Sequence, residues 1–256
     1  MGVGSMTRVL ILGGTGEARG LAAALVGRGF DVVTSLAGVT AKPVMPAGEV
    51  RRGGFGGVEG LAAYIAEADI GLVADCTHPF AAVISRHAGA AAALRGIAYV
   101  RLERPVWRPG PGDRWQEVAD VAAAVAALEP GATAFVTIGR KELAAFAQRS
   151  DVRVIARAIE PPGFTPPAGW KLVLGRPPFT LEAEMALMQG EGVSVLVTKN
   201  AGGEATRGKL DAARALRLPV VMVARPVKPA AETAATVEEM VERIAVLAGS
   251  PGQAGR

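Results

Sequence analysis

The regular alternation of short apolar runs with alanine-rich stretches of helical character constrains the fold most strongly. The first apolar run, residues 7–12, ends at consecutive glycines, and a stretch with helical character follows at residues 17–27. Continuous apolar strands separated by helices of this length are typical of parallel sheets that are covered on both faces. We therefore predict an α/β protein made of Rossmann-like units with right-handed crossovers.

Two series of such units are predicted, joined by a segment rich in Pro, Gly and Arg that has no periodicity. The first series has strands at 7–12, 31–36, 70–75 and 98–103, a short extended piece from Val50, and helices at 17–27, 58–67 and 80–95. The second has strands at 132–137, 152–157, 171–174, 193–198 and 220–224, and helices at 118–128, 141–149, 180–189, 204–216 and 236–247. We expect two Rossmann-like domains, residues 6–104 and 117–248, with a linker at 105–116 and the active site in the cleft between them.

A glycine-rich turn follows the first predicted strand and opens the first helix. It consists of Gly13, Gly14, Thr15, Gly16 and Glu17. Glycines allow a pyrophosphate to approach the backbone, and the amides at a helix start hold negative charge. The turn departs from the dinucleotide fingerprint, since Arg19 occupies the third glycine position, and no Gly-Lys-Ser/Thr of a P-loop follows. We predict that this turn binds the pyrophosphate of a dinucleotide.

The end of the second predicted strand carries no carboxylate between Thr34 and Lys42. NAD-binding domains use an acidic residue there to bind the ribose 2′-hydroxyl. A 2′-phosphate meets no repulsion here, so the sequence favours NADPH over NADH. The residues expected to lie near that phosphate are Ser35, Gly38, Thr40 and Lys42.

Polar residues from Asp75 to Ala81 end another predicted strand and should face the same ligand crevice. We expect Thr77 and His78 to lie near the nicotinamide, although His78 could instead cap the helix. Pro79 suits the first turn of the following helix.

Two strand-to-helix turns of the second series combine hydroxyls, amides and cations, which favours anion binding. Their scattered charges suit several carboxylates better than one phosphate. The residues predicted to bind substrate are Arg140, Lys141, Lys199, Asn200, Gly202, Thr206 and Lys209. Arg225 adds a cation at the end of the next strand, where a lone arginine is more often a surface residue.

The composition excludes several classes of protein. The single cysteine, Cys76, and two histidines provide no metal-ligand spacing, so no metal is expected. The net charge of +4 is not gathered in a long basic run, which argues against nucleic-acid binding. No apolar run is long enough for a membrane helix. We expect a cytoplasmic protein, monomeric or weakly dimeric, that acts on a small molecule.

Together these motifs resemble the precorrin-6A reductase family of cobalamin biosynthesis. The resemblance covers about residues 8–225 and rests on Gly13–Ala18, Asp75-x-Thr77-His78-Pro79-Phe80-Ala81, Gly139-Arg140-Lys141-x-Leu143, Thr198-Lys199-Asn200-x-Gly202, Lys209, Ala212–Arg214 and Leu218–Val220. It implies two Rossmann-like domains, NADPH as hydride donor and a tetrapyrrole with many carboxylate arms as acceptor, giving precorrin-6B. Cys76 stands where a small residue such as alanine is expected.

Direct hydride transfer needs no covalent nucleophile, and the proton donor is left open. Water, a substrate carboxyl, His78 or Lys199 could supply that proton. A cobalt-containing substrate and a non-enzymatic NADPH sensor stay open as alternatives. A short-chain dehydrogenase is disfavoured because neither Tyr64 nor Tyr99 is followed four residues later by a lysine.

Overall fold

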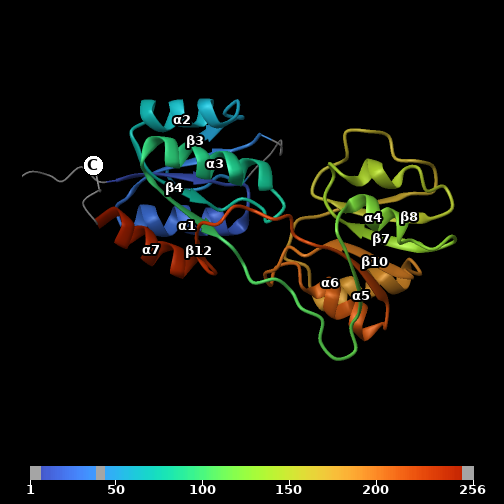
Figure 1. Ribbon diagram of the computed structural model, residues 1–256. Helices are drawn as coiled ribbons and strands as arrows, with labels where there is room; N and C mark the ends of the chain where they lie inside the picture. Colours follow the sequence, from blue (N-terminus) through green and yellow to red (C-terminus); the bar gives the residue numbers. More distant parts are fainter. Residues whose placement is uncertain (1–6, 39–43, 250–256) are drawn as a thin grey trace, which may run out of the picture. The chain divides into compact units, whose positions relative to one another are not determined.

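The computed structural model of the protein describes residues 7–38 and 44–249 (Figure 1). The chain divides into two compact units. The first runs to Arg104 and resumes at Pro226, and the second spans Pro105–Arg225. The chain therefore passes between the units twice, at residues 104–105 and 225–226.

The described residues of the first unit form a six-stranded sheet in which the paired strands are parallel. Its order is β12-β5-β4-β1-β2-β3. The strands are β1 (Arg8–Leu12), β2 (Asp31–Leu36), β3 (Glu49–Arg52), β4 (Ile70–Asp75), β5 (Ala98–Leu102) and β12 (Glu232–Ala234). The helices are α1 (Gly16–Gly27), α2 (Val58–Glu67), α3 (Ala82–Arg95) and α7 (Val237–Gly249).

Alternating side chains of the central strands fill two apolar layers, one on each face of this sheet. Val9 and Ile11 pack with residues of α1 and α7, whereas Leu10 and Leu12 pack with residues of α2 and α3. Figure 1 accordingly shows the two pairs of helices on opposite sides of the sheet. Each such side chain, fully buried, contributes about 1.5–3 kcal/mol to folding. The period of two in β1 thus explains why an unbroken apolar run fits between two helical layers.

The second unit contains another parallel six-stranded sheet among the described residues, in the order β6-β11-β10-β7-β8-β9. The strands are β6 (Arg114–Val118), β7 (Thr133–Thr137), β8 (Arg153–Ala158), β9 (Lys171–Leu174), β10 (Val195–Lys199) and β11 (Pro219–Val223). The helical elements are α4 (Val121–Ala126), the 3₁₀ helix η1 (Leu143–Phe146), α5 (Leu181–Gly190) and α6 (Gly208–Ala215).

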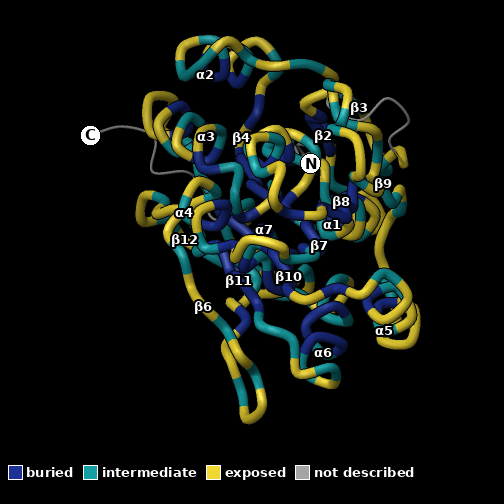
Figure 2. Tube along the Cα trace, turned by 90° about the vertical axis from the view of Figure 1, so that its right-hand side faces the viewer, coloured by how far each residue is buried: buried dark blue, intermediate teal, exposed yellow. Residues whose placement is uncertain are grey.

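The two sheets follow the same plan. The order β3-β2-β1-β4-β5-β12 corresponds to β9-β8-β7-β10-β11-β6, which is the strand order of Rossmann domains. In the second unit Phe135, Ile155 and Leu196 pack against Met188 of α5 and Leu210 of α6. Figure 2 shows β7, β10 and β11 as largely buried, as expected for central strands that are covered on both faces. The predicted fold class is therefore confirmed.

The structure corrects the predicted domain boundaries. Residues 226–248 were assigned to the second domain, but β12 pairs with β5, and Met240 and Ile244 of α7 belong to the first core. The predicted linker 105–116 belongs to the second unit, where Arg114 begins the edge strand β6. Both errors have one cause. Pairing between segments distant in the chain leaves no local pattern in the sequence.

Several predicted helices also differ from the structure. The helix predicted at 204–216 is shortened to α6, which begins only at Gly208. The segment 141–149 forms only the 3₁₀ turn η1, and the helix predicted at 118–128 is shortened to α4 because its first residue, Val118, belongs to β6. Pro79 precedes α3 by three residues instead of lying in its first turn. The alanines around these segments are compatible with helix, but the local turns and strand pairing prevail.

Candidate functional site

The candidate ligand edge of the first unit lies where β1 and β4 are neighbours, because the strand order reverses direction there. Leu12 pairs with Asp75 at the carboxyl ends of the two strands, and the Cys76 amide donates to the Leu12 carbonyl at 2.9 Å. The glycine-rich turn and the segment from Cys76 to Phe80 therefore start side by side, as the sequence predicted.

Thr15 caps α1 and ties these two segments together. Its Oγ1 accepts a hydrogen bond from the Ala18 amide at 3.1 Å and donates to the Cys76 carbonyl at 2.8 Å. Gly13 is required by close packing, since a Cβ there would lie 2.8 Å from Cγ2 of Thr34. Gly14 has a φ of +108°, a conformation that favours glycine. The start of α1 therefore lies at the candidate ligand edge, and backbone amides at a helix start favour an anion.

Glu17 differs from the other residues of the turn. Its carboxylate forms an ion pair with Arg104, with 2.6 Å between Oε1 and Nη1. A carboxylate next to a pyrophosphate would repel it, so this pair neutralises a charge that would oppose binding. Glu17 can therefore serve an anion through its backbone amide, and Arg104 is a nearby cation that the sequence analysis did not identify.

Two arginines of β3 lie beside the carboxyl end of β2. Arg51 and Arg52 pair in register with Ser35 and Leu36, and the Arg51 Nη1 donates to the Ser35 Oγ at 3.2 Å. Neither arginine was predicted as a site residue, because β3 is short and has no apolar pattern. Gly38 is exposed with a φ of +74°, whereas the predicted residues Thr40 and Lys42 lie outside the described residues.

A buried carboxylate organises the segment after β4. Asp75 is fully buried and accepts hydrogen bonds from the Thr77 amide at 3.0 Å, the Thr77 hydroxyl at 2.7 Å and the Tyr99 hydroxyl at 2.8 Å. Burial, with a further contribution from Asp75, raises the pKa values of Tyr99 and Cys76, so both groups stay protonated at neutral pH. Thr77 was predicted to contact the cofactor, but its hydroxyl donates a hydrogen bond to this carboxylate.

His78 follows this cluster and is exposed. Its Nδ1 accepts a hydrogen bond from the Phe80 amide at 3.3 Å, which fixes the ring beside the turn that precedes α3. The imidazole thus lies at the predicted edge of the sheet. It does not cap α3, because that helix begins at Ala82 and its N-cap, Ala81, has no side-chain hydrogen bond.

The second unit has an equivalent edge where β7 and β10 are neighbours. Lys199, only 11% exposed, forms an ion pair with Glu142, and the Arg140 Nη1 lies 3.1 Å from Oε2 of Glu160. Lys141, in contrast, is exposed. The structure therefore gathers the predicted cations at one edge, with two of them already beside carboxylates of the chain.

Asn200 and Lys209, both predicted to bind substrate, are buried and hydrogen-bonded within the chain. Both ends of the Asn200 amide bind the backbone of Trp107 at 2.9 Å. Lys209 is 4% exposed, and its Nζ donates to the Thr206 carbonyl at 2.7 Å. Burial, with repulsion from Arg157, lowers the pKa of Lys209 to about 7. The sequence placed these polar residues at a strand end and a helix start, but it could not show which neighbours they contact.

A buried ion pair at the end of β8 was also missed. Arg157 pairs with Glu184 of α5, and its guanidinium lies 3.8 Å from the ring centre of Phe179. Both charged side chains are buried, as is Lys209. The loop residue Gly202, a predicted substrate ligand, is buried as well and has a φ of +67°.

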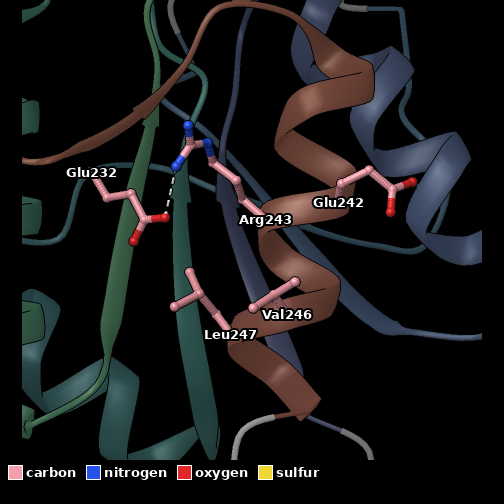
Figure 3. Close-up of a pocket in the computed structure, with 5 residues that line it drawn as sticks. All are labelled: Glu232, Glu242, Arg243, Val246 and Leu247. Carbon is pink, nitrogen blue, oxygen red and sulfur yellow. Dashed lines mark hydrogen bonds and ion pairs between the residues drawn. The ribbon is translucent and has the colours of Figure 1, made fainter.

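A hollow of about 280 Å³ on the first unit lies away from these motifs (Figure 3). Glu232 begins β12, and Val246 and Leu247 end α7, so the hollow opens at the amino ends of the strands. Arg243 bridges to Glu232 at 3.0 Å across it, as Figure 3 shows. Its position and small volume separate it from the ligand edge.

The residues that the structure describes contain no cluster of three His, Cys, Asp or Glu side chains able to hold a metal ion. Within 7–38 and 44–249, no helix has the length and apolar character needed to cross a bilayer.

Comparisons with known proteins agree with the resemblance. The family profile "Precorrin-6x reductase CbiJ/CobK" matches residues 8–245. A precorrin-6A reductase of Rhodococcus erythropolis is 50% identical over 89% of this chain and 93% of its own length. A cobalt-precorrin-6A reductase of Priestia megaterium is 30% identical over 92% of this chain and 97% of its own.

A solved structure extends the agreement to the fold. The structure titled "CobK precorrin-6A reductase" covers 98% of this chain and 100% of its own, with a TM-score of 0.90 and 42% identity. The sequence match and the structural match both span nearly the whole globular chain. The protein therefore belongs to the precorrin-6x reductase family.

Proposed function

We propose that this protein is an NADPH-dependent precorrin-6A reductase, an oxidoreductase that reduces a ring double bond of a carboxylate-rich tetrapyrrole to give precorrin-6B. The match to precorrin-6A reductases over nearly the whole chain carries this proposal. The 50% identity to a precorrin-6A reductase, against 30% to a cobalt-precorrin-6A reductase, favours the metal-free substrate.

The family of reductases implies a nucleotide cofactor, and the first unit fits a dinucleotide. The amides at the start of α1 suit a pyrophosphate, and Arg104 neutralises the one carboxylate of the turn. The sequence from Thr34 to Lys42 has no acidic residue, and Arg51 and Arg52 lie on the neighbouring strand. Cations without a carboxylate at this position support binding of a 2′-phosphate, and hence NADPH over NADH.

The cationic edge of the second unit suits the substrate. Arg140 and Lys199 each contact a carboxylate of the chain, which supports their suitability as partners for acetate and propionate arms. Lys141 is exposed beside them. Charge-assisted bonds of this kind are about twice as strong as neutral ones. We assign substrate binding to these three cations and to the 201–207 loop, which contains Gly202 and Thr206.

The bound cofactor supplies a hydride, and the protein aligns donor and acceptor. Orientation alone can lower the barrier by about 7–11 kcal/mol. One carbon of the double bond receives the hydride and its neighbour a proton. His78 at the edge of the first unit and Lys199 at the edge of the second are the candidate donors among the residues assigned to ligand binding. The thiol of Cys76 is buried and burial raises its pKa, so it is not proposed as a participant.

Spectrophotometry tests the proposal. The protein is mixed with precorrin-6A and either NADPH or NADH, and both the nicotinamide and the macrocycle absorbance are followed. Conversion of the macrocycle with consumption of NADPH, faster than with NADH, is expected. The same assay with the cobalt-containing substrate should be slower. NADPH binding without turnover of either macrocycle would contradict the proposal and would support a sensor.

A further inference from the structure

The loop between β10 and α6 is tied to the segment that enters the second unit. The Asn200 Oδ1 accepts a hydrogen bond from the Trp107 amide, and its Nδ2 donates to the Trp107 carbonyl, both at 2.9 Å. Buried backbone groups need partners, and here one side chain satisfies both groups as a neighbouring strand would. Asn200 therefore fixes where the chain enters this unit.

The side chain of Trp107 strengthens the same connection. The residue is 5% exposed and belongs to the core around Phe135 and Leu196. Its Nε1 donates to the Gly203 carbonyl at 3.2 Å, and the Lys209 Nζ lies 4.8 Å from the ring centre. The indole thus contacts both the loop and the helix that follows the loop.

Arg225 ties the loop to the segment that leaves the unit. It donates to the carbonyls of Asn200 at 2.7 Å and Ala201 at 2.9 Å, and it reaches the Pro105 carbonyl at 3.4 Å. It is the last residue of the second unit. The segment that enters the second unit and the segment that leaves it are therefore both hydrogen-bonded to one loop. That loop begins directly after Lys199.

We propose that Asn200, Trp107 and Arg225 are positioning residues for tetrapyrrole binding, which hold the 201–207 loop and Lys199 at the carboxyl edge of the second sheet. The inference rests on the proposed function. A positioning role explains why the polar side chain of Asn200, directly after β10, is buried in the protein. Lys199 is coupled to the same junction, because its carbonyl accepts the Ala201 amide at 2.7 Å.

Matched arginine variants test this inference. Arg225→Ala removes bonds to the loop. Arg149→Ala removes two 2.7 Å bonds to the carbonyls of Val125 and Leu128, near the amino ends of the strands, and an ion pair with Asp151. Both should lower the melting temperature. Only Arg225→Ala, like Asn200→Ala, should raise the KM for precorrin-6A tenfold or more, with the NADPH dissociation constant changed less than twofold. Equal effects of Arg225→Ala and Arg149→Ala on that KM would overturn the inference.

Conservative variants distinguish a loss of positioning from misfolding. Trp107→Phe keeps a ring in the core and both backbone bonds to Asn200, so the KM should rise less than threefold. Arg225→Lys keeps a donor for the loop and should recover most of the loss. A KM in folded Arg225→Lys as high as in Arg225→Ala would contradict the positioning role.

Hydrogen exchange separates this inference from the proposed function. If the wild-type protein does not convert precorrin-6A, the proposed function fails. The amides of 201–207 should still exchange at least tenfold faster in Asn200→Ala than in wild type, and no faster in Arg149→Ala. Unchanged exchange in Asn200→Ala would refute the loop connection itself.

Discussion

At the scale of single residues, the most informative group is the buried amine of Lys209. It lies near the guanidinium of Arg157, stacks on Trp107 and has the Thr206 carbonyl as a hydrogen-bond acceptor. Burial first, and then repulsion by Arg157, lowers its pKa from 10.5 to about 7. An amine that loses its proton more readily in the folded than in the unfolded chain makes stability depend on pH.

The sign of this dependence can be tested with Lys209→Met. Between pH 7 and 9 the unfolded chain keeps a proton at Lys209 that the folded chain releases, so the free energy of unfolding should rise with pH. Above pH 9 the raised pKa of Cys76 acts in the opposite direction. Denaturant titrations at several pH values should show a flatter profile in Lys209→Met. Identical slopes in the two proteins would contradict the lowered pKa.

A second residue, Arg51, tests the choice of cofactor. If it helps to bind the 2′-phosphate, Arg51→Gln should raise the KM for NADPH roughly tenfold, since hydrogen bonds to charged groups contribute about 1.5–3 kcal/mol. The KM for NADH should change much less. Arg95→Gln, at an exposed position that ends α3, removes the same charge and serves as control. Parallel changes for both cofactors would argue against a 2′-phosphate contact.

At the scale of elements, the carboxyl edge of the first sheet depends on the cap of α1. Thr15 joins the glycine-rich turn to the segment after β4, because its hydroxyl accepts from Ala18 and donates to Cys76. One side chain thus sets both the start of the helix and the distance between two predicted ligand segments.

Replacing this cap should affect stability and cofactor binding together. Thr15→Val preserves the shape of the side chain but loses both hydrogen bonds. The free energy of unfolding, measured in denaturant, should therefore fall by about 1–2 kcal/mol. The KM for NADPH should also rise. Thr15→Ser keeps the hydroxyl and should behave almost as wild type. If Thr15→Val binds NADPH normally despite the lower stability, the turn is not the pyrophosphate site.

Elements with a strong local pattern were predicted well from the sequence. Predicted and observed bounds coincide for β2 (Asp31–Leu36), α2 (Val58–Glu67) and β4 (Ile70–Asp75), where apolar runs or helical periodicity span the whole element. The edge strand β6 was missed because its polar, largely unburied residues show no such pattern. The three-residue β12 was missed because it is defined by pairing with β5.

The candidate site was predicted less completely than the fold. Parallel topology placed Gly13–Glu17, His78 and Lys199 at the expected edges, since carboxyl ends of strands lie together. The sequence could not distinguish a ligand from a structural partner, which is why Asn200 and Lys209 were assigned to substrate. It also could not reveal Arg51 or Arg157, because their positions follow from strand register and side-chain packing.

At the scale of the whole molecule, the two sheets obtain the equivalent edge strand from different places in the chain. In the first unit that strand, β12, and the helix α7 arrive only after the second unit is complete. In the second unit the corresponding strand, β6, comes first. The first unit is therefore completed by residues at the end of the chain.

This arrangement predicts the effect of shortening the chain after Ala235. Loss of α7 removes Met240 and Ile244 from the first core, so NADPH affinity should fall at least tenfold. All three tryptophans, Trp107, Trp115 and Trp170, lie in the second unit. Their native fluorescence should therefore persist. A red-shifted tryptophan spectrum with intact NADPH binding would mean that the C-terminal segment stabilises the other unit.

The most direct test of the whole account follows the hydride itself. The protein is incubated with precorrin-6A and NADPH that carries deuterium at both C4 positions of the nicotinamide, and the tetrapyrrole is analysed by mass spectrometry. A reduced macrocycle containing one deuterium is expected, with the added proton coming from the medium. Oxidation of the cofactor without deuterium in the macrocycle, or no reduction at all, would contradict direct hydride transfer by this protein.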